Sequence, residues 1–182
     1  MSLKHAILGL LNIQPMTGYT LKNEAFESTV AHFWQADQAQ IYRTLDKMEA
    51  DGWLSSEYEV QQDRPNKRVY SITEAGQAEL VRWLGTEQSL PVYREPFLVQ
   101  MFFAGLLPKD EILQQIEVHI TGHKARLAQL DAIDMQIPPY DDAMARNRLF
   151  WGLTLELGIE QERMYLRWLE HCKSAISAAE HT

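Results

Sequence analysis

Apolar residues recur at helical spacing along most of the chain. Between residues 37 and 52, Ile41 and Leu45 are one helical turn apart and Met48 follows three residues later. This spacing predicts a helix that buries one face and turns its polar face outward. Three more segments of the first 85 residues are predicted to be helices: 3–12, 17–28 and 73–85.

The pattern changes after Gly52 from helical spacing to strand-like composition. Residues 53–60 and 69–73 are rich in residues that favour strands, and the segment between them ends in the turn-forming, cationic stretch 64–68. We expect a β-hairpin with a cationic tip. Three helices followed by such a hairpin define a winged helix-turn-helix, which we assign to residues 1–85.

The second half of the chain is predicted to be helical throughout. Residues 86–96 contain two prolines without periodicity and are interpreted as a linker to a domain at 97–182. That domain has two long helical patterns separated by Pro138 and Pro139, with apolar steps of three and four that are typical of paired helices. Two such helices bury little surface as an isolated hairpin, so a second copy of the chain is expected to pack on them.

The predicted fold class is therefore mainly α, with an N-terminal winged helix-turn-helix that has a two-stranded wing, and a C-terminal all-α dimerisation region. The candidate dimerisation residues follow the apolar pattern of the two long helices: Leu113, Ile116, Ile120, Leu127, Leu149, Leu153, Leu157, Met164 and Trp168.

Composition indicates a globular protein. The chain has 182 residues, of which 46% are hydrophobic, enough for a packed core. The longest apolar run, at 97–107, is too short to span a bilayer, and no secretory signal is recognisable, so we expect a cytoplasmic protein without membrane contact. Cys172 is the single cysteine, which excludes an intrachain disulfide.

The net charge of −8 argues against a simple nucleic-acid binder, because phosphates favour a basic surface. The local clustering of cations, however, favours nucleic-acid binding. Arg64, Lys67 and Arg68 lie in one five-residue stretch of the hairpin, and Arg43 and Lys47 are one helical turn apart. A dimer would present these cations twice.

The helix at 37–52 and the hairpin supply the candidate DNA contacts. Gln38 and Tyr42 suit base edges or phosphates, whereas Gln40 either contacts DNA or completes a capping box with Asp37. Tyr70 is expected to brace the wing strand by pairing with Tyr58 and Val60. The full candidate set is Gln38, Gln40, Tyr42, Arg43, Lys47, Arg64, Lys67, Arg68 and Tyr70.

Catalytic and metal-binding chemistry find no support in the sequence. His119 and His123 have the spacing of two metal ligands on a helix, but no third ligand has matching spacing, so we interpret them as structural. No nucleophile and base pattern and no phosphate-binding loop is present, so neither an enzyme nor a cofactor is expected. Four aromatic residues either line a pocket for a planar effector or pack in the core: Tyr93, Phe97, Tyr140 and Trp151.

Short motifs lie at residues 6–11, 17–21, 33–34, 40–45, 48–52 and 68–76. In combination they resemble the PadR family of bacterial transcriptional regulators. The resemblance covers residues 1–85, and the remainder is similar more loosely to a virulence-activator-type C-terminal region. It implies a homodimer held by its C-terminal helices, two winged helices that read a pseudo-palindromic operator, and repression often relieved by a small molecule such as a phenolic acid.

The leading hypothesis is a dimeric, non-enzymatic transcription factor that places the 37–52 helix in the major groove of DNA. Two alternatives remain open. The acidic field suits a winged-helix adaptor that binds protein. The aromatic residues of the second half suit a small-molecule sensor in which DNA contact is secondary.

Overall fold

The computed structural model describes residues 3–30, 33–34, 36–59, 67–133 and 142–179, with no account of the side chains at 27–29 and 142–145. The chain forms two compact units, Met1–Pro91 and Val92–Thr182. Within the described ranges, no helix is both long and apolar enough to cross a membrane.

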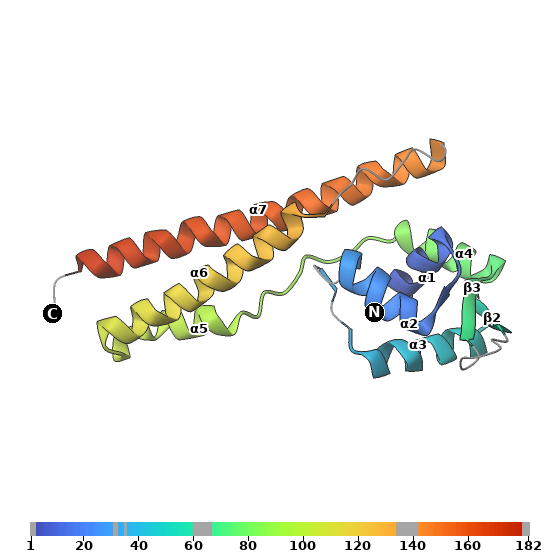
Figure 1. The fold of residues 1–182 in the computed structure, drawn as a ribbon, viewed down its shortest axis with the longest axis horizontal. Coiled ribbons are helices and arrows are strands. Elements are labelled where there is room, and N and C mark those ends of the chain that lie inside the picture. The colour runs from blue at the N-terminus through green and yellow to red at the C-terminus, as the bar shows by residue number, and fades with distance from the viewer. Residues whose placement is uncertain (1–2, 31–32, 35, 60–66, 134–141, 180–182) are drawn as a thin grey trace. The chain divides into compact units, whose positions relative to one another are not determined.

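The helices of the first unit begin at the caps that the sequence provides. The Thr17 hydroxyl accepts a hydrogen bond from the Thr20 backbone N–H at 3.0 Å, and the Thr73 hydroxyl accepts one from the Gly76 N–H at 3.1 Å. These side chains satisfy N–H groups that the first helical turn leaves unpaired. The helical elements, shown in Figure 1, are α1 (Leu3–Ile13), α2 (Gly18–Thr20) continued by the π-helix η1 (Leu21–Val30), α3 (Gln38–Ala50) and α4 (Glu74–Leu84).

The predicted four helices of this unit are confirmed in place and order, but the second differs in kind. It runs mostly as a π-helix and reaches Val30, beyond the predicted end near residue 28. A π-helix bonds each N–H one residue further along than an α-helix, and apolar spacing does not separate the two.

The sheet has three antiparallel strands in the order β1-β3-β2, with β1 at Met16–Thr17, β2 at Leu54–Glu59 and β3 at Lys67–Ile72. The sequence predicted only the β2–β3 hairpin. The third strand escaped prediction because two residues carry no alternating pattern. Its partners lie far along the chain, with Met16 opposite Tyr70.

The predicted pairing of Tyr70 with Tyr58 is wrong by two residues along β2. Tyr70 lies opposite Ser56, and Tyr58 lies opposite Arg68. Val60, the other predicted partner, is outside the described residues.

One hydrophobic core holds this unit together and sets the orientation of α3. Helix α3 contributes Ile41, Leu45 and Met48, all three almost completely buried, as the spacing predicted. The polar face of α3 is therefore turned away from the core. The rest of the core comes from the other elements: Ile7, Leu8, Leu10, Leu11, Met16, Leu21, Phe26, Val30, Leu54, Tyr70 and Leu80.

The second unit consists of helices only. Long helices α6 (Lys109–Asp131) and α7 (Asp142–Ala178) lie side by side, and they follow the short α5 (Pro96–Phe102) and a 3-10 turn η2 (Ala104–Leu106). Its buried core is formed by Phe97 from α5, Ile116 and Ile120 from α6, and Leu169 from α7. Helix α5 is thus fastened to the helix pair through one face.

Gly76 generates a prediction about stability. A Cβ atom at this position would lie 2.2 Å from the backbone oxygen of Trp53 and 2.9 Å from the Ile72 side chain. Because backbone cannot move aside cheaply, Gly76→Ala should lower the free energy of unfolding by about 1–3 kcal/mol or more, as measured by chemical denaturation. Gly85→Ala is the matched control: its Cβ would lie 3.6 Å from the nearest atom, an ordinary contact. Equal losses of stability for the two variants would contradict the close packing inferred at the start of α4.

Candidate nucleic-acid interface

The outward face of α3 combines small residues with two cations and one carboxylate. It lies opposite the buried Ile41, Leu45 and Met48, so the core itself determines what is displayed. The Arg43 Nε donates a hydrogen bond to the Ala39 carbonyl at 3.2 Å, which lays the guanidinium back along the helix. Small neighbours allow another surface to approach the helix closely. The exposed residues of this face are Ala39, Arg43, Asp46, Lys47 and Ala50.

The start of α3 is closed by the predicted capping box. The Asp37 carboxylate accepts a hydrogen bond from the Gln40 N–H at 2.7 Å, and the Gln40 side-chain oxygen accepts one from the Asp37 N–H at 3.3 Å. Of the two roles left open for Gln40, the structural one is therefore present. Gln38, in the first turn, is exposed.

Tyr42 is held against the preceding helix of the motif. A Cβ on Gly18 would lie 2.6 Å from the Tyr42 ring, so only glycine lets the start of α2 approach this ring so closely. Tyr42 is half-buried, and part of it remains accessible beside the exposed face of α3. The contact fixes the crossing of the two helices in the helix-turn-helix.

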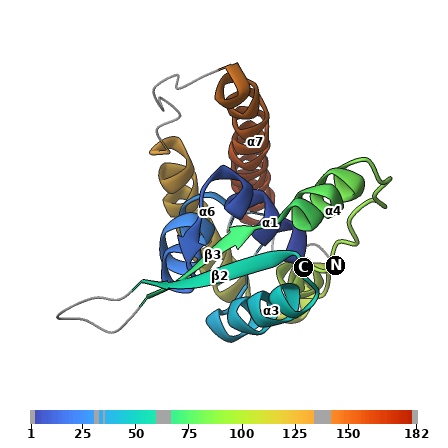
Figure 2. The same ribbon diagram turned by 90° about the vertical axis from the view of Figure 1, so that its right-hand side faces the viewer.

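The wing supplies further cations, of which the structure describes two. Figure 2 shows the β2–β3 hairpin lying beside α3. Lys67 is exposed at the start of β3, opposite Glu59. Arg64 lies outside the described residues.

Arg68 is engaged within the protein. Its guanidinium donates to Ser56 Oγ at 2.9 Å, to Asp46 Oδ1 at 3.3 Å and, more closely still, to Glu49 Oε2. Burial opposes its charged form, but the aromatic and carboxylate neighbours outweigh this and raise the pKa of Arg68. Sequence patterns could not indicate this network, because its members come from three different elements.

Tyr70 braces the wing, as expected. Its side chain is only 2% exposed and lies in the core of the first unit. Burial raises the pKa of its hydroxyl, an effect that nearby Arg68 opposes. Its position supports the surface and does not allow direct contact with a partner.

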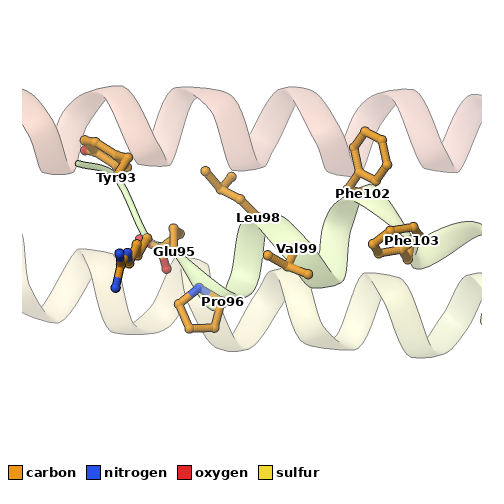
Figure 3. A pocket seen from close by; sticks show the side chains of 8 residues that line it. Tyr93, Glu95, Pro96, Leu98, Val99, Phe102 and Phe103 are labelled. Atoms are coloured by element: carbon orange, nitrogen blue, oxygen red, sulfur yellow. The ribbon is translucent and has the colours of Figure 1, made fainter.

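The second unit has a hollow of about 600 Å³ beside α5. Figure 3 shows its side chains projecting from α5, from the segment just before it and from Phe103 just after it. The lining is mainly apolar and aromatic, with one arginine and one glutamate. It consists of Tyr93, Arg94, Glu95, Pro96, Leu98, Val99, Phe102 and Phe103.

The predicted effector residues that the structure describes are not brought together in this hollow. Tyr93 lines it, whereas Phe97 is buried on the other side of α5 and stacks on His119 with ring centroids 3.5 Å apart. Trp151 is half-buried on α7 and is not part of the lining, and Tyr140 lies outside the described residues. Of the two roles left open for these aromatic residues, Phe97 therefore takes the one in core packing.

His119 and His123 have structural partners. His123 Nδ1 lies 2.5 Å from Glu162 Oε2, and its ring stacks on Tyr165 at 4.6 Å. The other Glu162 oxygen is 3.3 Å from Arg126 Nε. Within the part of the chain that the structure describes, no group of three potential ligands could hold a metal ion.

The candidate dimerisation residues divide into three groups by exposure. Ile116 and Ile120 are buried in the unit's own core, so the dimerisation prediction is corrected for these two, and Trp168 is half-buried against that core. Leu113 and Leu127 are half-buried on α6. The remainder form an exposed apolar stripe on α7, which we name the α7 stripe: Leu149, Leu153, Leu157 and Met164.

Taken together, the first unit is a winged helix-turn-helix joined to a helical second unit, an architecture of transcriptional regulators. A model described as the transcriptional regulator PadR-like family matches residues 7–82, and one described as virulence activator alpha C-term matches residues 93–177. The chain belongs to the PadR family of transcriptional regulators.

Individual relatives resemble the chain over nearly its whole length. The negative transcriptional regulator PadR of Bacillus subtilis is 28% identical over 171 residues, which is 92% of this chain and 93% of the relative. The crystal structure of that organism's PadR in complex with operator DNA has a TM-score of 0.81 and 27% identity, covering 97% of this chain and 99% of the other. Its complex with p-coumaric acid has a TM-score of 0.74 and 26% identity, with the same coverage.

His119 generates a prediction about pH. Burial lowers its pKa, the neighbouring His123 lowers it further, and Glu95 opposes them. The folded protein therefore holds His119 neutral where the unfolded chain, with a value of 6.5, already binds a proton. This contribution to stability is present above about pH 6.5 and is lost as the pH falls through the folded value.

We expect the melting temperature of the wild type to fall more between pH 7.5 and 5.5 than that of His119→Gln, measured by circular dichroism of the full chain. His171→Gln, at an exposed position of α7, is the control and should keep the wild-type pH dependence. Identical pH profiles for His119→Gln and the wild type would contradict the assignment.

Proposed function

We propose that this protein is a non-enzymatic, sequence-specific DNA-binding regulator that acts as a homodimer on a pseudo-palindromic operator. The observation that carries the proposal is the exposed face of α3, with Arg43 and Lys47 between two alanines and the wing beside it. A helix with this surface fits the major groove, and a cationic wing reaches the flanking backbone. The operator complex of Bacillus subtilis PadR supports the same use of the fold.

The proposed contacts fall into two kinds. Arg43, Gln38 and Tyr42 lie where a groove-bound helix meets base edges, whereas Lys47 and Lys67 suit phosphates. Arg64 is proposed as a further phosphate contact on sequence grounds. The net charge of −8 does not prevent this, because screening at physiological salt limits distant charges to a range of about 8 Å.

Two exposed apolar surfaces of the second unit support a homodimer. Helix α5 is apolar except for Gln100: Phe97 faces the core, while Leu98, Val99 and Phe102 are between 39% and 81% exposed. A helix that is hydrophobic all round is normally buried. The α7 stripe is a second such surface, and another copy of the chain would cover both.

Twofold pairing implies the form of the operator. A symmetric dimer presents two α3 helices related by a twofold axis, so its site should consist of inverted half-sites. Adjacent major grooves on one side of the duplex are about 34–36 Å apart. We propose this separation for the two half-sites.

The hollow beside α5 supports response to an aromatic acid. Arg94 offers a cation, and Tyr93, Phe102 and Phe103 offer ring surfaces. The p-coumaric acid complex of Bacillus subtilis PadR shows that this relative binds such a compound. Because the hollow adjoins the apolar face of α5, a ligand there would act on the proposed dimer contact, and relief of repression is the expected result.

The first test concerns the phosphate contacts. Binding to a duplex selected by the wild-type protein from a random library should weaken steeply with salt. Lys47→Ala and Lys67→Ala should each make the slope of log K against log salt shallower, by about 0.9 for each phosphate that is no longer neutralised and hence by about 1.8 for a dimer. Lys124→Ala, exposed on α6, should leave the slope unchanged. A salt-independent complex would contradict the proposal, and failure of the wild type to select any duplex would favour the protein-binding adaptor.

A second test concerns the dimer. Leu153, on the α7 stripe, is 52% exposed in the single chain, and a charge there would be buried unpaired in the proposed interface. Leu153→Asp should therefore shift sedimentation equilibrium from dimer to monomer while the helical circular dichroism signal is retained. Val81→Asp, on an exposed face of α4, is the control and should stay dimeric. A dimer in both variants would rule out the α7 stripe as the contact.

A further inference from the structure

A closed ring of hydrogen bonds joins α3 to the wing. Arg68 of β3 donates to Ser56 of β2 and to Glu49 of α3, and the Ser56 hydroxyl in turn lies 2.5 Å from the second Glu49 oxygen. Asp46, one turn earlier on α3, accepts a third bond from the guanidinium. Three elements that are separate in the sequence are thereby tied together at one point.

Two tyrosine rings also lie close to the Arg68 guanidinium. Its central carbon lies 4.9 Å from the centre of the Tyr70 ring and 5.9 Å from that of the Tyr58 ring. All three guanidinium nitrogens already donate to side chains of the protein. A planar fork with fixed donors suits this arrangement, whereas the single ammonium of a lysine does not.

The two acidic partners of Arg68 differ in exposure. The Asp46 side chain is 66% exposed and its contact is the longer one, whereas Glu49 is 29% exposed and bonds both Arg68 and Ser56. On a helix that faces DNA, a carboxylate repels phosphates unless another role outweighs the repulsion. Glu49 has such a role, and Asp46 has a weaker one.

We propose that Arg68 and Glu49 form a positioning clamp that fixes the wing against α3, and that Arg68 does not contact phosphate. The proposal rests on the DNA-binding function proposed above. Both residues are assigned to the positioning of the wing. The sequence had indicated Arg68 as a DNA contact and had not indicated Glu49. Without the clamp the wing must be ordered during binding, which weakens the complex without removing a phosphate contact.

The decisive experiment compares Glu49→Ala with Asp46→Ala, since each removes one negative charge from the same flank of α3. The clamp predicts that Glu49→Ala weakens binding about tenfold, the loss expected when a charge-assisted hydrogen bond is removed. The slope of log K against log salt should stay at its wild-type value. Asp46→Ala should bind equally or more tightly. The probe is the duplex selected by the wild-type protein.

Arg68→Lys separates charge from geometry. If Arg68 positions the wing, this variant should bind about as weakly as Glu49→Ala, again with an unchanged salt slope. Two results would overturn the proposal: tighter binding by Glu49→Ala, or wild-type affinity for Arg68→Lys together with a shallower salt slope for Arg68→Gln.

A measurement on the free protein keeps the clamp testable if the proposed function fails. Hydrogen exchange of the β3 backbone amides should be faster in Glu49→Ala than in the wild type and unchanged in Asp46→Ala. Failure of the wild type to bind any duplex would refute DNA binding alone. Unchanged exchange in Glu49→Ala would refute the clamp alone.

Discussion

The burial of one face of α3 is the constraint on which the first unit depends. Ile41, Leu45 and Met48 can be removed from water only when the helix lies against α1 and the sheet. That single orientation determines which side chains are displayed, because a helix that buries one stripe must expose the opposite one. The exposed position of Arg43 and Lys47 is a consequence of this packing.

Charge in this protein acts locally. The chain is acidic as a whole, yet several of its carboxylates are engaged by neighbouring cations. Glu79 is paired with Arg82 and His5, and these hydrogen bonds lower its pKa to about 2. Glu162 is likewise occupied by His123 and Arg126. The electrostatic potential that a partner experiences depends on the exposed groups at the surface it contacts. The net charge of the whole chain describes this potential poorly.

The second unit is stable only through helix pairing, and its own core is small. Four fully or almost fully buried residues from α5, α6 and α7 form its centre, with half-buried neighbours around them. The large apolar side chains left outside, such as Phe102 and Leu106, are exposed to an extent that an isolated soluble unit seldom tolerates. The exposed apolar side chains of α5 line the hollow and also belong to the contact proposed for the homodimer.

The sequence by itself determined the local features of the protein, and the tertiary structure alone decided the contacts between distant segments. The spans of α1, α3 and α4, the presence of two long helices in the second half, the capping box at Asp37 and the hairpin could all be predicted, because periodicity and capping depend on residues only a few positions apart. The pairing of β1 with β3, the bond of Arg68 to Glu49, the ion pair of His123 with Glu162 across 39 residues, and the inward position of Phe97 and Ile116 could not. An apolar residue has the same pattern whether its partner is its own chain or another, and a cation has the same pattern whether it meets a carboxylate or a phosphate. Only the fold, by bringing distant residues together, separates these cases.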